Sequence, residues 1–209
     1  LNLNTAAGVT AVGTRALESN TTGVYNTAVG TYALIANSSS NNNTAVGYDA
    51  LNDNTDGSEN TAIGSFALDK NTTADNVTAV GYNSLGGNTT GANNTAVGSS
   101  ALANNTTASN NVAVGRESLM SNTTGFTANT AVGDATLRAN TTGSGNVAVG
   151  YTALREGTTR TNNTAVGFEA LRLGTTGNNN TAVGRDSLTN NTAHNNTGLG
   201  HYTLRANTS

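Results

Sequence analysis

Residues 43–59 read NTAVGYDALNDNTDGSE, and closely related seventeen-residue units fill the chain on both sides of this stretch. Each unit is too short to bury a core of its own, so neighbouring units must stabilise one another. The sequence therefore predicts one continuous repeat array over residues 1–209, which we expect to be a fragment or mature segment of a longer fibre. The motif glycines recur at steps of 17, apart from one step of 18 and a final step of 16: Gly13, Gly30, Gly47, Gly64, Gly81, Gly98, Gly115, Gly133, Gly150, Gly167, Gly184 and Gly200.

Composition narrows the possible partners and compartments. The chain has a formal net charge of -3 and lacks a long basic run, so we expect no nucleic-acid partner. It has no cysteine, and no apolar stretch approaches the ~20 residues of a membrane helix. We therefore expect no thiol chemistry and no membrane insertion within this segment.

The residue pattern favours short strands over helices. Glycine and asparagine recur inside every possible helical stretch, and the apolar spacing does not follow a period of 3.6. Because side chains alternate along a strand, Val46 and Thr44 share one side and Ala45 takes the other. We predict an all-β parallel β-roll or β-solenoid of about twelve coils, with the valine and leucine columns inside.

The alanine of each strand is the most constant residue on the predicted outer side. It is replaced once, by Gly198, although a side chain that faces water should vary freely. This constancy indicates a close neighbour, either an adjacent turn of the same chain or a second subunit. The sequence leaves both interpretations open.

Two asparagine columns mark the corners of the predicted coil. The first, which includes Asn20 and Asn88, is replaced only by Gly157 and Gly174. Asparagine and glycine both tolerate positive φ, so this column predicts a left-handed turn. The second column precedes the Thr-Ala-Val strand and predicts a ladder of stacked amides, which Val77 interrupts once.

The strand motif resembles a known class of repeat. Thr-Ala-Val-Gly and Val-Ala-Val-Gly followed by x-x-Ala are similar to the head repeats of trimeric autotransporter adhesins, and the longer unit resembles repeats of bacterial surface and phage tail-fibre proteins. The resemblance covers the whole chain. It implies a left-handed parallel β-roll, a homotrimer, a place outside the cell or on a virion, and a role in attachment. The longer repeat leaves a single-chain solenoid or a filament of stacked subunits open.

Positions that differ between units are the candidates for binding. Aromatic residues gather one or two positions after the motif glycine, where they predict either a surface for host glycans or an interchain seam. An arginine column predicts a basic stripe for anionic polysaccharide, with a solvated face as the alternative. The aromatic edge comprises Tyr32, Tyr48, Phe66, Tyr82, Tyr151, Phe168 and Tyr202, and the basic stripe comprises Arg138, Arg155, Arg172 and Arg205.

Catalytic and metal-binding patterns are weak. His194 and His201 are the only histidines, and Asp186 and Ser187 lie near them without a nucleophile-elbow motif. Asp56 is alone in its column, whereas calcium β-rolls need a repeated aspartate. We therefore expect no enzyme activity, no metal and no cofactor.

These observations predict a rigid extracellular rod of a cell-surface adhesin or phage tail fibre that mediates attachment. The alternative is a subunit that stacks end to end into an extracellular filament. In both cases the expected partner is another copy of the chain, as a trimer or a filament. Host surface glycan or polysaccharide is the second expected partner.

Overall fold

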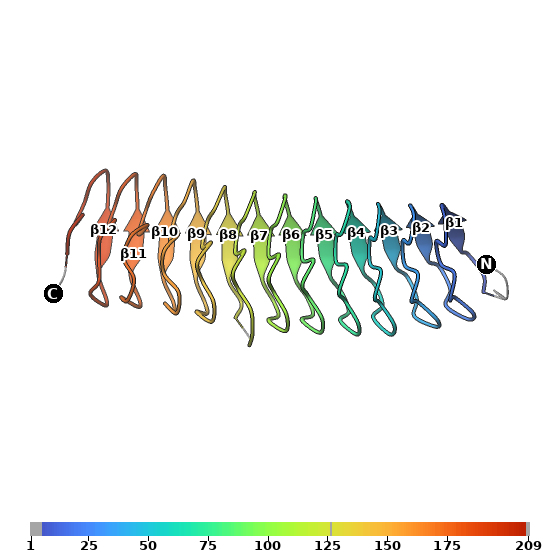
Figure 1. Ribbon diagram of the computed structural model, residues 1–209. Helices are drawn as coiled ribbons and strands as arrows, with labels where there is room; N and C mark the ends of the chain where they lie inside the picture. Colours follow the sequence, from blue (N-terminus) through green and yellow to red (C-terminus); the bar gives the residue numbers. More distant parts are fainter. Residues whose placement is uncertain (1–5, 126, 208–209) are drawn as a thin grey trace.

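The computed structural model describes residues 6–125 and 127–207, which form a parallel β-solenoid without a helix in the described ranges (Figure 1). Twelve three-residue strands form one sheet in chain order, so each coil contributes one strand. The predicted all-β parallel solenoid of about twelve coils is confirmed. The strands are β1 (Thr10–Val12), β2 (Thr27–Val29), β3 (Thr44–Val46), β4 (Thr61–Ile63), β5 (Thr78–Val80), β6 (Thr95–Val97), β7 (Val112–Val114), β8 (Thr130–Val132), β9 (Val147–Val149), β10 (Thr164–Val166), β11 (Thr181–Val183) and β12 (Thr197–Leu199).

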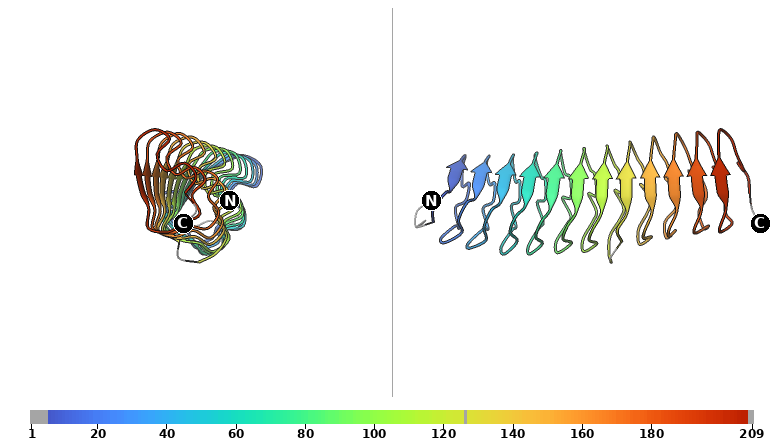
Figure 2. Two further views of the ribbon diagram at one scale, coloured as in Figure 1. Left: turned by 90° about the vertical axis from the view of Figure 1, so that its left-hand side faces the viewer. Right: turned by 180° about the vertical axis from the view of Figure 1, so that it is seen from behind.

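The register keeps equivalent residues of successive coils side by side. Ala45 pairs with Ala62, and Val46 pairs with Ile63. Viewed along the axis, the coils superimpose with a gradual offset, and the N- and C-terminal coils lie at opposite ends of the rod (Figures 1 and 2). A strand spacing of about 4.8 Å gives a rod about 50 Å long.

Backbone hydrogen bonds between coils extend beyond the short strands. Leu51 N donates to Ala67 O at 3.0 Å in the following coil, and Gly47 N donates to Val29 O at 2.9 Å in the preceding one. Such bonds recur around the turns of most coils. Each coil is therefore held by both of its neighbours, as expected for a repeat that cannot fold alone.

The leucine column forms the core, as predicted. The leucines from Leu17 to Leu188 are at most 1% exposed, whereas Leu204 in the last coil is 50% exposed. Every leucine of this column has a positive φ, between 46° and 54°. Left-handed backbone disfavours leucine by about 1–2 kcal/mol, so burial of the side chain must offset a strained turn in every coil.

The strands face the opposite way from our prediction. The strand alanines from Ala28 to Ala182 are completely buried, whereas the flanking threonine and valine face outward. Ala96 in β6 is 0% exposed, for example, and Val97 is 37% exposed. The reason is space: leucine and a further small residue already occupy the narrow interior, so only a methyl group fits beside them. The constancy of alanine thus reflects the size of the core and says nothing about a second subunit.

This reversal predicts unequal effects of substitution at two adjacent positions. Ala96→Leu should destabilise the rod by about 1–3 kcal/mol, because it overpacks a filled interior. Val97→Thr, on the outward side, should destabilise the rod less than Ala96→Leu, because it adds no volume to the interior. Urea denaturation followed by circular dichroism measures both values. Equal costs, or a greater cost at Val97, would contradict the inward placement of alanine.

The first asparagine column is buried and does not form the predicted left-handed turn. Asn88 does not have a positive φ, and its Nδ2 atom donates to Asn71 Oδ1 at 3.1 Å and to Gly91 O at 3.1 Å. Each member from Asn37 to Asn140 donates in the same way to its counterpart in the preceding coil. We call this series the amide ladder; it comprises Asn20, Asn37, Asn54, Asn71, Asn88, Asn105, Asn122 and Asn140.

The second asparagine column links successive coils, but the recurring bond runs from a backbone N–H to the amide oxygen of the preceding coil and not from amide to amide as predicted. Side-chain amides also donate to their counterparts at Asn111, Asn146 and Asn163. Asn60 N donates to Asn43 Oδ1 at 3.0 Å, and the side-chain amide of Asn60 donates to Ala74 O at 2.8 Å. Val77 has no side-chain amide and takes part only through its backbone N–H, which donates to Asn60 Oδ1 at 3.0 Å. Two parallel columns of asparagine therefore bind the coils together.

The motif glycines form a column in which backbones touch. Their φ angles run from +114° to +141°, a region that L residues rarely adopt. A Cβ atom added to Gly98 would lie 2.5 Å from Gly115 O in the next coil. The repeat therefore requires glycine here for both its conformation and its lack of a side chain.

Candidate functional site

The outward threonine and valine side chains form a continuous surface along one side of the rod. We call it the Thr/Val face; it consists of the first and third residues of β1–β12. This face is partly apolar, because several of its valine, isoleucine and leucine side chains are more than one third exposed. They include Val12 at 58%, Ile63 at 41%, Val97 at 37%, Val132 at 36%, Val149 at 37%, Val166 at 36%, Val183 at 39% and Leu199 at 65%.

Four of the seven predicted aromatic-edge residues touch one another across four successive coils. We call Tyr32, Tyr48, Phe66 and Tyr82 the aromatic ladder. Its neighbouring rings meet edge to face, with centroid distances of 6.1, 5.4 and 6.0 Å in chain order. The Arg15 guanidinium lies over the Tyr32 ring, 5.5 Å from its centroid. These contacts restrict the rotation of each ring.

The other three aromatic-edge residues lie in separate groups. Tyr151 and Phe168 stack at 5.1 Å with an interplanar angle of 18°, and Arg185 covers Phe168 from the next coil at 5.2 Å. Tyr202 contacts His201 at 4.0 Å and lies under Arg205 at 5.2 Å. The sequence column therefore contains three groups and not one uniform surface.

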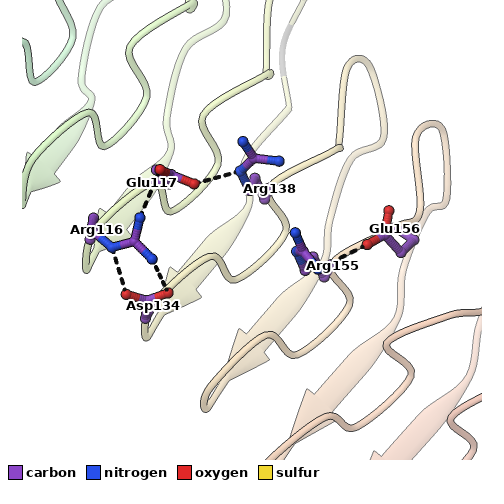
Figure 3. A network of polar contacts seen from close by, with 6 residues as sticks. All are labelled: Arg116, Glu117, Asp134, Arg138, Arg155 and Glu156. Atoms are coloured by element: carbon purple, nitrogen blue, oxygen red, sulfur yellow. Dashed lines mark hydrogen bonds and ion pairs between the residues drawn. The ribbon is translucent and has the colours of Figure 1, made fainter.

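The predicted basic stripe is largely paired with carboxylates. Arg138 Nε lies 2.6 Å from Glu117 Oε2, and Arg155 Nη1 lies 3.3 Å from Glu156 Oε1 (Figure 3). Arg172 Nη1 lies 2.9 Å from Glu169 Oε2. Arg205 is instead engaged with the Tyr202 ring. These contacts reduce the positive charge that the column presents to an anionic ligand.

A further arginine joins two coils of this network. Arg116 Nε lies 3.0 Å from Asp134 Oδ2, and Arg116 Nη1 lies 2.8 Å from Glu117 Oε1 (Figure 3). Hydrogen bonding and attraction by Asp134 raise the pKa of the Arg116 guanidinium. Because the arginine is exposed, the network contributes little stability, and its main effect is to neutralise charge.

His194, Asp186 and Ser187 do not form a hydrolytic triad. His194 Nδ1 accepts a hydrogen bond from Asn178 N at 3.0 Å. The Ser187 hydroxyl is buried and donates to Gly198 O at 3.0 Å. Asp186 pairs with Arg185 at 3.2 Å. Each side chain therefore has a different partner.

The burial of Arg160 could not be foreseen from the repeat pattern. Its side chain is only 1% exposed, and its Nη2 atom donates to Leu171 O at 2.8 Å. Its Nε and Nη1 atoms have no hydrogen-bond partner, and burial lowers its pKa to about 10. A Cβ atom at Gly157 would lie 2.3 Å from Arg160 Nε, so the arginine occupies space next to the glycine. Glycine in this column is thus explained by a large neighbour.

Residues 6–125 and 127–207 contain no group of three or more histidine, cysteine, aspartate or glutamate side chains that could hold a metal ion. In the same ranges no helix has the length and apolar character needed to cross a membrane. Comparisons of the chain with protein-family models, with curated proteins and with solved structures each found no match.

Proposed function

We propose that this chain is a structural and adhesive rod of an extracellular fibre, displayed on a cell surface or a virion. The rod holds a binding surface away from its support or makes contact itself. It assembles with other copies of the chain through the Thr/Val face. The resemblance to adhesin heads and tail-fibre repeats motivates the location and the role in attachment.

The exposed apolar side chains of the Thr/Val face carry the proposal. Val97 and Val166 are the last residues of β6 and β10, and they are 37% and 36% exposed. Contiguous apolar surface of this kind marks interaction sites in proteins. Identical coils repeat the same surface along the rod, so a second copy in register provides a matching apolar face over the same length.

A left-handed homotrimer is the assembly that the resemblance favours. Three chains with their Thr/Val faces turned toward a common axis would remove three apolar surfaces from water at once. Closed symmetry of this type limits growth and leaves the turns outside. The aromatic ladder and the arginine column lie in the turns and would remain near the outer edges.

The native mass of the particle tests this assembly. We expect three chains per particle by native mass spectrometry and by light scattering across a range of concentrations. A monomer at all concentrations would contradict association through the Thr/Val face. Open-ended growth would contradict the closed trimer and support a subunit that stacks end to end into a filament.

A matched pair of substitutions in one coil identifies the contact surface. Val166→Glu places a charge on the Thr/Val face and should dissociate the trimer, because like charges would meet at a desolvated contact. Leu173→Glu is the control, since Leu173 is 45% exposed and lies outside the strand. Sedimentation velocity measures both. Equal effects of the two variants would contradict the proposed face.

A further inference from the structure

The aromatic ladder contains two kinds of ring that alternate along the rod. Tyr48 and Tyr82 directly follow the motif glycines Gly47 and Gly81, and they are 45% and 58% exposed. Phe66 is one position further from its glycine, is only half-buried, and contacts both tyrosines. The two exposed rings are therefore held in place by a ring between them.

The spacing of the exposed tyrosines follows from the coil repeat. They occupy equivalent positions two coils apart, which corresponds to about 9.6 Å along the rod. This spacing is close to the length of one disaccharide unit in an extended β-linked polysaccharide. A chain of this kind that lies parallel to the rod axis would bring every second sugar ring to a tyrosine.

The surroundings of Tyr48 provide polar groups for a sugar. Asp49 adjoins the ring, and its Oδ1 atom accepts a hydrogen bond from Asn52 Nδ2 at 2.9 Å. The negative charge of Asp49 raises the pKa of the Tyr48 hydroxyl, so the phenol stays neutral at physiological pH. Carboxylate, amide and phenol groups beside an aromatic ring provide both acceptors and donors for sugar hydroxyls.

The N-terminal half of the rod, which contains Tyr48 and Tyr82, has a net charge that favours a neutral ligand. Up to Asn110 the chain has two basic and seven acidic residues, a net charge of -5. An anionic polysaccharide would be repelled here. A neutral polysaccharide is compatible with this field.

We propose that Tyr48 and Tyr82, supported by Phe66, form a stacking platform for a neutral, extended β-linked polysaccharide that lies along the rod. This inference rests on the proposed attachment function and names its ligand class. The negative faces of aromatic rings attract the weakly positive C–H groups of a sugar ring. Rings fixed by mutual contact lose little freedom when the ligand binds.

The Tyr151–Phe168 pair does not meet the same conditions. Its two rings lie in adjacent coils and stack on one another, so each covers a face of its partner. Arg185 also lies over Phe168. This pair therefore provides an internal comparison with similar exposure and different geometry.

Calorimetric titration of the native protein with defined oligosaccharides tests the platform. Cellohexaose and chitohexaose are the extended β-linked probes, and maltohexaose is the curved α-linked control. We expect saturable binding of at least one β-linked probe and much weaker binding of maltohexaose. Tyr48→Ala and Tyr82→Ala should each reduce the affinity about fivefold to tenfold, whereas Tyr48→Phe should retain most of it.

Two control variants separate the platform from exposed aromatics in general. Tyr25→Ala removes a tyrosine that is 62% exposed in another turn, and Tyr151→Ala disrupts the stacked pair. Both should bind as tightly as the unmodified protein. Absence of saturable binding to either β-linked probe, or equal loss in the controls, would overturn the platform.

The same samples distinguish this inference from the assembly proposal. A trimer that binds neither β-linked probe would refute the platform and leave the rod assembly intact. A monomer that binds sugar through Tyr48 and Tyr82 would refute the assembly and retain the platform. If Tyr48→Ala dissociates the particle and no probe binds, the aromatic ladder is an interchain seam and the platform is wrong.

Discussion

Gly98→Ala is expected to destabilise the rod near its middle by at least about 3 kcal/mol. The φ angle of Gly98 is +137°, and an L residue forced into such a region costs about 1–3 kcal/mol. The added methyl would also lie 2.5 Å from Gly115 O, an atom that belongs to backbone and has little room to move. Strain and collision therefore act together at this position.

Guanidinium denaturation and hydrogen exchange measure the effect. Because coils stabilise one another as neighbours, the loss should be greatest around β6 and β7 and weaker at the ends of the rod. Gly200→Ala is the matched control: its φ is +114°, and its nearest atom would be Thr203 Cγ2 at 3.4 Å. It retains the strain without the backbone collision. Equal costs at the two positions would show that the collision contributes nothing.

Arg160→Gly combined with Gly157→Asn is expected to stabilise the folded rod by about 2–4 kcal/mol. Burial lowers the pKa of Arg160 to about 10, which corresponds to a cost of about 3 kcal/mol at neutral pH. In addition, Asn140 Oδ1 is buried without a donor. A new amide at position 157 would continue the amide ladder and supply that donor, which offsets the lost packing of the arginine.

Chemical denaturation of three proteins checks this result. The unmodified chain and Arg160→Gly alone are the references, because the single variant removes the charge but leaves a void and an unsatisfied amide. The double variant should have the highest denaturation midpoint, with protection from hydrogen exchange increased around β9 and β10. A double variant no more stable than the unmodified chain would contradict the cost assigned to the buried guanidinium.

The seventeen-residue period and the leucine column could be predicted from sequence because each coil needs a large apolar side chain in its interior. The side of each strand that faces the interior could not be predicted. In a three-residue strand alternation separates Ala96 from Val97, but it does not say which side is interior. That choice depends on the width of the coil, which is set by tight turns such as the left-handed one at Leu102. No residue type in the leucine column signals positive φ.

The corner asparagines show how one substitution pattern can have two causes. Exchange of asparagine for Gly157 and Gly174 predicts a positive φ at this position, yet neither the asparagines nor these glycines adopt one. Glycine at 157 accommodates Arg160. The pairing of Arg138 with Glu117 across coils likewise depends on side-chain positions that columns do not encode.

The amide ladder gives the rod an electrical direction. From Asn37 to Asn140 each side-chain amide donates toward the preceding coil and accepts from the following one where a counterpart exists, so the individual dipoles add. The positive end of this array lies toward the N-terminal coils and the negative end toward the C-terminal coils. The formal charges have the opposite polarity to these dipoles. The net charge is -5 up to Asn110, and it is +2 from Asn111 onward, where seven basic and five acidic residues lie. In rods packed side by side in parallel, the apolar contact must therefore exceed the repulsion between these dipoles, whereas rods placed head to tail gain from their attraction.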